Sequence, residues 1–103
     1  HYILGRNPVN RSLVTGVGSH AVAQPYHQFA MVLDVGSTIP GMMVGGANYR
    51  QQLRGEKLSE YPGKSYEDNP KNYFVNEPAI NWTAIFAFTA GYFSSPNHVL
   101  HTN

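Results

Sequence analysis

One of the chain's six carboxylates has neighbours that suit acid chemistry. Glu77 lies between the aromatic stretch 73–75 and an almost wholly apolar run that extends to Phe93. Partial burial there would favour the protonated carboxyl and suit a general acid, whereas a helix N-terminus would stabilise the ionised form. The alternative is a first-turn glutamate that only complements the helix dipole. Three other carboxylates lie in polar, charge-mixed sequence typical of solvated surface groups: Glu56, Glu60 and Glu67.

The five histidines do not predict a metal site. Their spacings fit no compact zinc pattern, and the absence of cysteine excludes disulfides and thiolate ligands. His27 is distinctive because Pro25, Tyr26 and Phe29 flank it in a predicted loop. Aromatic rings with polar tips can stack on sugar rings and bind their hydroxyls. The alternative is that His27 packs and caps a backbone carbonyl.

Several other functions are excluded by pattern or charge. The glycines between 41 and 46 lack the lysine of a phosphate-binding loop, and no serine lies in a G-x-S-x-G motif. A net charge of +1 argues against electrostatic binding to nucleic acid or to a membrane surface. The longest strongly apolar stretch, Ala84 to Phe93, is about half the length of a membrane span.

The elements that must position these residues are mostly loops. The exception is a final helix, for which the sequence predicts Asn76 as N-cap, Glu77 in the first turn and Pro78 at an early position. Apolar residues cover nearly every face of this helix, so we expect it to be buried on most sides. At the other end of the chain, Gly5 is expected to cap the last turn of a helix. The remaining expectations are an extended or looped segment at 11–18, a short strand or helix at 30–35, a turn-rich loop at 39–48, a solvated turn or two of helix at 49–58, a polar loop at 59–72 and a terminal tail at 94–103.

The composition suggests that the chain is part of a larger folded unit. Its 103 residues match one domain, but only 13% are charged, about half the usual share. A small protein normally covers its large surface with charge. We therefore expect much of this surface to face other protein or a neutral polar ligand.

Four stretches carry a family resemblance. Three are YILGRNP at 2–8, VTGVGSHAVAQPYHQ at 14–28 and PGMMVGGAN at 40–48. The fourth is the most specific and consists of Tyr66, Asp68, Tyr73, Asn76, Glu77, Ala79, Trp82, Thr83 and Ala84. In order and spacing, these stretches resemble the C-terminal part of the catalytic domain of glycoside hydrolase family 9, the cellulase family of inverting endoglucanases and related enzymes.

The resemblance implies a fold and a set of site residues. The fold is all-α, an (α/α)6 barrel of several hundred residues, to which residues 1–103 would contribute the last helices and long cleft-forming loops. Glu77 falls on the family's general acid, and Asp68 falls on the acidic position that accompanies it at the cleft. His27 falls on a cleft histidine. The general base belongs to a paired-aspartate motif that this chain does not contain.

The departures from the family pattern leave the substrate open. Tyr26 replaces a histidine and Gln28 an arginine, while Trp82 replaces a tyrosine and Thr83 an asparagine. Tyr26, His27, Gln28 and Trp82 are predicted to contact sugar, although Trp82 can equally be a core residue. Loss of the arginine removes a cation that would repel a cationic sugar, so an exo-acting glucosaminidase or glucosidase is an alternative to an endoglucanase.

Two alternatives lie outside catalysis. The chain alone, without the base, can be a structural or sugar-contacting piece. The second of these alternatives is a carbohydrate-binding module, but such a module needs no acid at a helix start.

The expected partners are a β-1,4-linked oligo- or polysaccharide and the remainder of the barrel. No cofactor is required, and the resemblance allows structural calcium without naming ligands. An endoglucanase would favour secretion, and an exo-acting enzyme the cytoplasm or periplasm.

Overall fold

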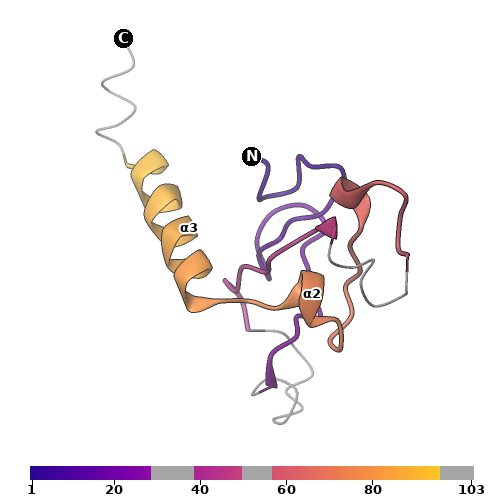
Figure 1. Cartoon of the computed structure of the whole chain (residues 1–103). Helices are drawn as coiled ribbons and strands as arrows, with labels where there is room; N and C mark the ends of the chain where they lie inside the picture. Colours follow the sequence, from indigo (N-terminus) through magenta and orange to yellow (C-terminus); the bar gives the residue numbers. More distant parts are fainter. Residues whose placement is uncertain (29–38, 50–56, 96–103) are drawn as a thin grey trace.

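The chain folds as a body of loops beside one long helix. The computed structural model describes residues 1–28, 39–49 and 57–95. Its helices there are the 3-10 helix η2 (Pro62–Lys64), the short α2 (Tyr73–Asn76) and α3 (Ile80–Phe93). Figure 1 shows α3 along one side of the loops, joined to α2 by a short extended stretch.

Three extended segments lie side by side within the loop body. Antiparallel bridges join Val14 to Met43 and Val44 to Pro78, so the segment at 43–44 is the middle one. Its amides reach both neighbours: Val44 N donates to Leu13 O at 2.9 Å, and Gly45 N donates to Glu77 O at 3.2 Å. The prediction of a turn-rich loop at 39–48 is therefore right for the turn at 40–41 and wrong for the segment that follows it.

Among the described residues, the buried core is small and includes as many polar as hydrophobic side chains. Its hydrophobic members are Leu13, Val14, Val22, Val44 and Val75, and its polar members are Ser12, Thr15, Ser65, Asn72 and Asn76. Buried polar groups need hydrogen-bond partners, so side-chain hydrogen bonds matter here as much as apolar contact.

The N-terminal turn has the hydrogen bonds that were expected of a helix end. Gly5 N donates to Tyr2 O at 3.2 Å, and Arg6 N donates to His1 O at 3.1 Å. Gly5 has a φ of +131°. This pair of bonds is the pattern that closes the C-terminus of a helix, although residues 2–5 form a turn and not a helix.

The start of the last helix differs from the prediction. α3 begins at Ile80 with Ala79 as its N-cap, so Asn76 is not the N-cap and Glu77 is not in the first turn. Asn76 instead ends α2, where its side chain makes tertiary hydrogen bonds. Pro78 pairs with Val44 in an extended bridge rather than starting the helix. Tertiary pairing thus overrides a sequence that satisfies the local rules for a helix start.

The surface of α3 also differs from the expectation of burial. None of its residues is buried among the described parts of the chain. Its exposed apolar side chains include Ile80, Ile85, Phe88, Tyr92 and Phe93. The helix ends at Phe93, before Pro96 as predicted. The predictions for 30–35, most of 49–58 and the tail beyond 95 lie outside the described residues.

Candidate active site

Glu77 extends into solvent from a backbone that is held on both sides. It follows α2 in an extended conformation and its side chain is exposed, so the expected partial burial is not found among the described residues. Gly46 N donates to Val75 O at 2.8 Å, Gly45 N donates to Glu77 O, and Tyr26 N donates to Asn76 O at 2.8 Å. The carboxyl group is therefore carried by a fixed backbone position.

Asp68 joins two segments that are distant in sequence. Its Oδ2 accepts from the Arg11 guanidinium at 3.0 Å and from Ala23 N at 2.8 Å. Its Oδ1 accepts from Gln24 N at 2.8 Å and faces Asn76 Nδ2 at 3.4 Å. Both oxygens of the carboxylate are occupied by donors, so Asp68 anchors the start of the segment that carries Tyr26, His27 and Gln28.

Asn76 links the backbone before Glu77 to the same segment. The side chain is fully buried. Its amide nitrogen donates to Gln24 O at 2.5 Å and to Asn69 O at 3.1 Å, besides the contact with Asp68. The main-chain carbonyl of Asn76 accepts from Tyr26 N. Through this one residue, the position of Glu77 is coupled to residues 24–26.

Tyr66 completes this group of polar side chains. Its hydroxyl donates to the side-chain oxygen of Asn76. Burial raises the pKa of the Tyr66 phenol well above its usual value, and the nearby Asp68 carboxylate acts in the same direction, against a smaller lowering by Arg11. The phenol therefore stays protonated, as the donor role requires.

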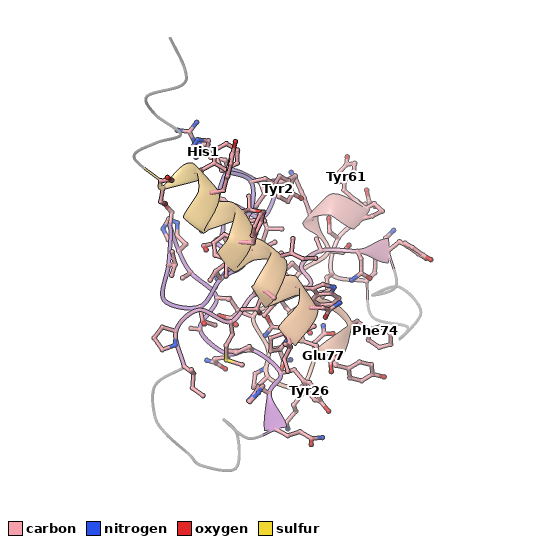
Figure 2. All side chains as sticks on the ribbon, turned by 90° about the vertical axis from the view of Figure 1, so that its left-hand side faces the viewer. His1, Tyr2, Tyr26, Tyr61, Phe74 and Glu77 are labelled. Atoms are coloured by element: carbon pink, nitrogen blue, oxygen red, sulfur yellow. The ribbon has the colours of Figure 1, made fainter. Side chains whose placement is uncertain are left out.

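Aromatic rings flank the Glu77 backbone. Tyr26 meets Tyr73 edge-on at a centroid distance of 5.8 Å, and Tyr73 stacks on Phe74 at 4.5 Å. In Figure 2, Tyr26, Phe74 and Glu77 lie toward the same end of the molecule as the start of α3. Stacked and edge-on rings of this kind can present faces to a sugar.

His27 and Trp82 line two different hollows. His27 borders one of about 380 Å³ together with Met42, Pro78 and the first turns of α3. Trp82 borders another of about 430 Å³ together with Gly45 and Phe74. Trp82 is 40% exposed, so the described residues leave both the platform and the core role open to it. Glu77 adjoins both sets of lining residues, because Pro78 follows it in the chain and Gly45 N donates to its carbonyl.

The structure brings together most of the predicted site residues. Asp68, Tyr26 and Glu77 are connected through Asn76, and His27 follows directly. Gln28 is exposed at the end of this segment. Trp82 reaches the group from α3, across Gly45, whose added Cβ would lie 3.1 Å from the indole ring. The arrangement offers one exposed carboxyl beside rings and polar groups, which suits acid chemistry on a neutral, hydroxyl-rich molecule.

Within residues 1–28, 39–49 and 57–95, no cluster of three or more histidine, aspartate or glutamate side chains is placed to hold a metal ion. The described residues therefore supply no side-chain cluster as ligands for the calcium ion that the family resemblance allows. Over the same residues, no helix has the length and apolar character needed to cross a membrane.

Three residues organise this region, and the sequence predicted no role for Tyr66 or Arg11 and for Asn76 only that of an N-cap. Tyr66 and Asn76 belong to the most specific motif, and their spacing relative to Asp68 and Glu77 was the available signal. Arg11 pairs with Asp68 across 57 positions, a contact that no local pattern indicates.

Comparison with known sequences gives one family. The family described as Glycosyl hydrolase family 9 matches residues 1–90. A xyloglucan-specific endo-beta-1,4-glucanase of Bacteroides ovatus is 41% identical over 83 residues, covering 81% of this chain and 14% of that protein. A cellulose 1,4-beta-cellobiosidase of Acetivibrio thermocellus is 32% identical over 98 residues, covering 88% of this chain and 11% of that protein. The chain thus spans a small part of the length of these relatives.

Solved structures agree with the sequences. A thermostable endoglucanase from Alicyclobacillus acidocaldarius, carrying a single substitution, superposes with a TM-score of 0.79 at 33% identity, over 91% of this chain and 18% of that one. AaCel9A in complex with cellobiose-like isofagomine gives a TM-score of 0.76 at 34% identity, over 90% of this chain and 19% of that one. The loop body and α3 therefore reproduce a segment of much larger enzymes.

Proposed function

The chain belongs to glycosyl hydrolase family 9, and from this we propose that it supplies the general acid of an inverting glycoside hydrolase that acts on β-1,4-linked glucans. Glu77 is the acid. The remainder of an (α/α)6 barrel supplies the general base, and the apolar surface of α3 packs against that remainder.

One observation carries the proposal. Glu77 is an exposed carboxyl on a backbone that Gly45, Gly46 and Tyr26 hold by hydrogen bonds at and beside it. A general acid must meet the leaving oxygen within hydrogen-bond reach, so a fixed backbone with a free-standing carboxyl suits the task. A glutamate that only complemented a helix dipole would lie in the first turn of α3, which Glu77 does not.

The reaction follows from these roles. The Glu77 carboxyl gives its proton to the glycosidic oxygen while the bond from that oxygen to the anomeric carbon breaks. A water molecule bonds to the anomeric carbon from the opposite face and loses a proton to the carboxylate base on the remainder of the domain. Inversion results because the water enters opposite to the departing sugar, which requires acid and base about 6.5 to 9.5 Å apart.

Replacement of Glu77 tests the assignment. In the full-length protein, Glu77→Gln keeps the shape and removes the transferable proton, and we expect kcat on cello-oligosaccharides to fall by about 100-fold or more. The matched control is Glu60→Gln, because the Glu60 side chain is 79% exposed and lies in the η2 region. Near-normal turnover of the Glu77 variant would contradict the proposal.

Product analysis tests the substrate class. We expect NMR to show internal cleavage of cello-oligosaccharides with the α-anomer formed first. Xyloglucan is included because a relative is named for it, and glucosamine oligosaccharides because Tyr26 and Gln28 depart from the family pattern. Release of single glucosamine units would replace the endoglucanase proposal by the exo-acting alternative. First formation of the β-anomer would contradict inversion.

The other predicted residues have supporting roles in this proposal. His27 and Trp82 contact sugar in their two hollows, and Tyr26 and Gln28 extend the surface beside His27. Asp68 acts on the position of this segment rather than on substrate, because all of its hydrogen-bonding capacity is directed at Arg11, two backbone amides and Asn76. Because His27 is proposed to contact sugar and not to transfer a proton, we expect His27→Ala to raise KM more than it lowers kcat.

A further inference from the structure

The residue before Glu77 is the point at which several segments meet. Asn76 is fully buried, and its side-chain amide donates to Gln24 O and Asn69 O. Its main-chain carbonyl accepts from Tyr26 N at 2.8 Å. A rotation of this side chain would break its bonds to Gln24 O and Asn69 O, and the bond from Tyr26 N would then be the remaining link between Asn76 and residues 24–26 among the described contacts.

One hydroxyl determines which way that amide points. An asparagine side chain can be rotated by half a turn, which exchanges its oxygen and nitrogen. The Tyr66 hydroxyl donates to the Asn76 oxygen, so the nitrogen must face the acceptors at Gln24 and Asn69. Asp68 strengthens the same choice, since its Oδ1 also faces the Asn76 nitrogen.

We propose that Tyr66 and Asn76 are positioning residues for proton transfer by Glu77: the Tyr66 hydroxyl fixes the Asn76 amide, and the amide fixes the Glu77 backbone against residues 24–26. The inference rests on the proposed role of Glu77 as the general acid. Neither side chain touches substrate in this arrangement. Their effect is on the distance and angle between the Glu77 carboxyl and the leaving oxygen.

A comparison of two leaving groups tests this role. A cello-oligosaccharide needs a proton on its departing sugar oxygen, whereas a dinitrophenyl cellobioside releases a stable phenolate without one. A loss of acid positioning therefore lowers turnover of the first substrate and leaves the second nearly unchanged. Both rates are measured on the same preparation of full-length protein, so their ratio does not depend on the fraction that is folded.

Tyr66→Phe removes the hydroxyl and nothing else. We expect kcat on the oligosaccharide to fall about 10-fold or more, since misplacements of about 1 Å cost up to about 100-fold, while kcat on the dinitrophenyl substrate changes less than about 2-fold and KM is unchanged. The matched control is Tyr61→Phe, because Tyr61 is 64% exposed and lies away from Glu77 in Figure 2. Its ratio of the two rates should equal that of the unmodified protein.

Glu77→Gln separates the two proposals. A selective loss with Glu77→Gln and with Tyr66→Phe supports both. A selective loss with Glu77→Gln, together with an unchanged ratio for Tyr66→Phe, overturns the positioning role and keeps the acid. An unchanged ratio for Glu77→Gln overturns the acid itself. A shift of the ratio in Tyr61→Phe as large as in Tyr66→Phe would also overturn the positioning role.

Discussion

The guanidinium of Arg11 donates to the Asp68 carboxylate at 3.0 Å, and this ion pair connects the first loop of the chain to the segment that leads to Glu77. The Asp68 side chain is 15% exposed and that of Arg11 is 33% exposed. Solvent therefore partly screens the ion pair. Most of the contribution of the Asp68 carboxylate to stability comes from the hydrogen bonds that it accepts from Ala23 N and Gln24 N.

Asp68→Asn should destabilise the protein and impair turnover. The new amide would place N–H groups toward Arg11, Ala23 N or Gln24 N, which are all donors, and leave some of them unpaired. We expect a loss of about 2 kcal/mol in the free energy of unfolding in urea. The control Glu60→Gln should change it by less than about 0.5 kcal/mol, because the Lys57–Glu60 pair is exposed. Equal effects of the two substitutions would contradict the anchoring role of Asp68.

Substitutions of two glycines in the segment 39–48 distinguish the effect of backbone strain from that of close packing. Gly46 has a φ of +82°, and a Cβ there would lie 3.0 Å from the Leu13 side chain. Gly41 has a φ of +89°, and a Cβ there would meet no atom of the described residues within 4 Å. Gly41→Ala should cost about 1 to 2 kcal/mol from strain alone. Gly46→Ala should cost about 1 to 3 kcal/mol more, because the core must shift as well. Chemical denaturation of the full-length protein measures both, and equal losses would show that the loop relaxes away from Leu13.

The sequence predicted those features of the fold that depend on neighbouring residues. Gly5 closes the first turn because positive φ is cheap for glycine and the two bonds it allows are local. The end of α3 at Phe93 and its apolar character likewise follow from a short window of sequence. The fourth motif placed Asp68 and Glu77 in one region, although only by resemblance.

The remaining features depend on contacts between distant segments. Asn76, Glu77 and Pro78 read as a helix start, but the bridge from Val44 to Pro78 and the bond from Gly45 to Glu77 draw these residues into an extended segment. The start of α3 is thereby delayed to Ile80. The exposure of α3 has the same kind of origin, because burial of an apolar helix requires partners that the described residues do not supply.

Besides the packing of Trp82 against Gly45, one side-chain hydrogen bond joins α3 to the segment at 43–44 among the described contacts. Met43 N donates to Thr83 Oγ1 at 3.3 Å, where the family pattern has an asparagine. Thr83→Val removes the acceptor and should lower the free energy of unfolding by about 1 kcal/mol. Thr89→Val is the matched control, because the Thr89 hydroxyl bonds only to Ile85 O of its own helix among the described contacts and its loss should be nearly neutral. Thermal unfolding of both variants gives the comparison, and equal shifts would show that the Met43 bond contributes nothing.

Tyr66 should make the protein sensitive to alkali. Burial raises the pKa of its phenol above the ordinary value of about 10, so the folded state holds this proton where the unfolded state has released it. The associated stability is fully present below about pH 10 and is lost as the pH rises further toward the folded-state pKa. Tyr66→Phe removes the titrating group, so the free energy of unfolding of this variant should fall less steeply above pH 10 than that of the unmodified protein. Tyr61→Phe serves as the control, because it removes the hydroxyl of an exposed tyrosine. Urea unfolding at several pH values between about 8 and 11 measures the slopes, and parallel curves for the unmodified protein and Tyr66→Phe would show that the phenol is not buried in the folded protein.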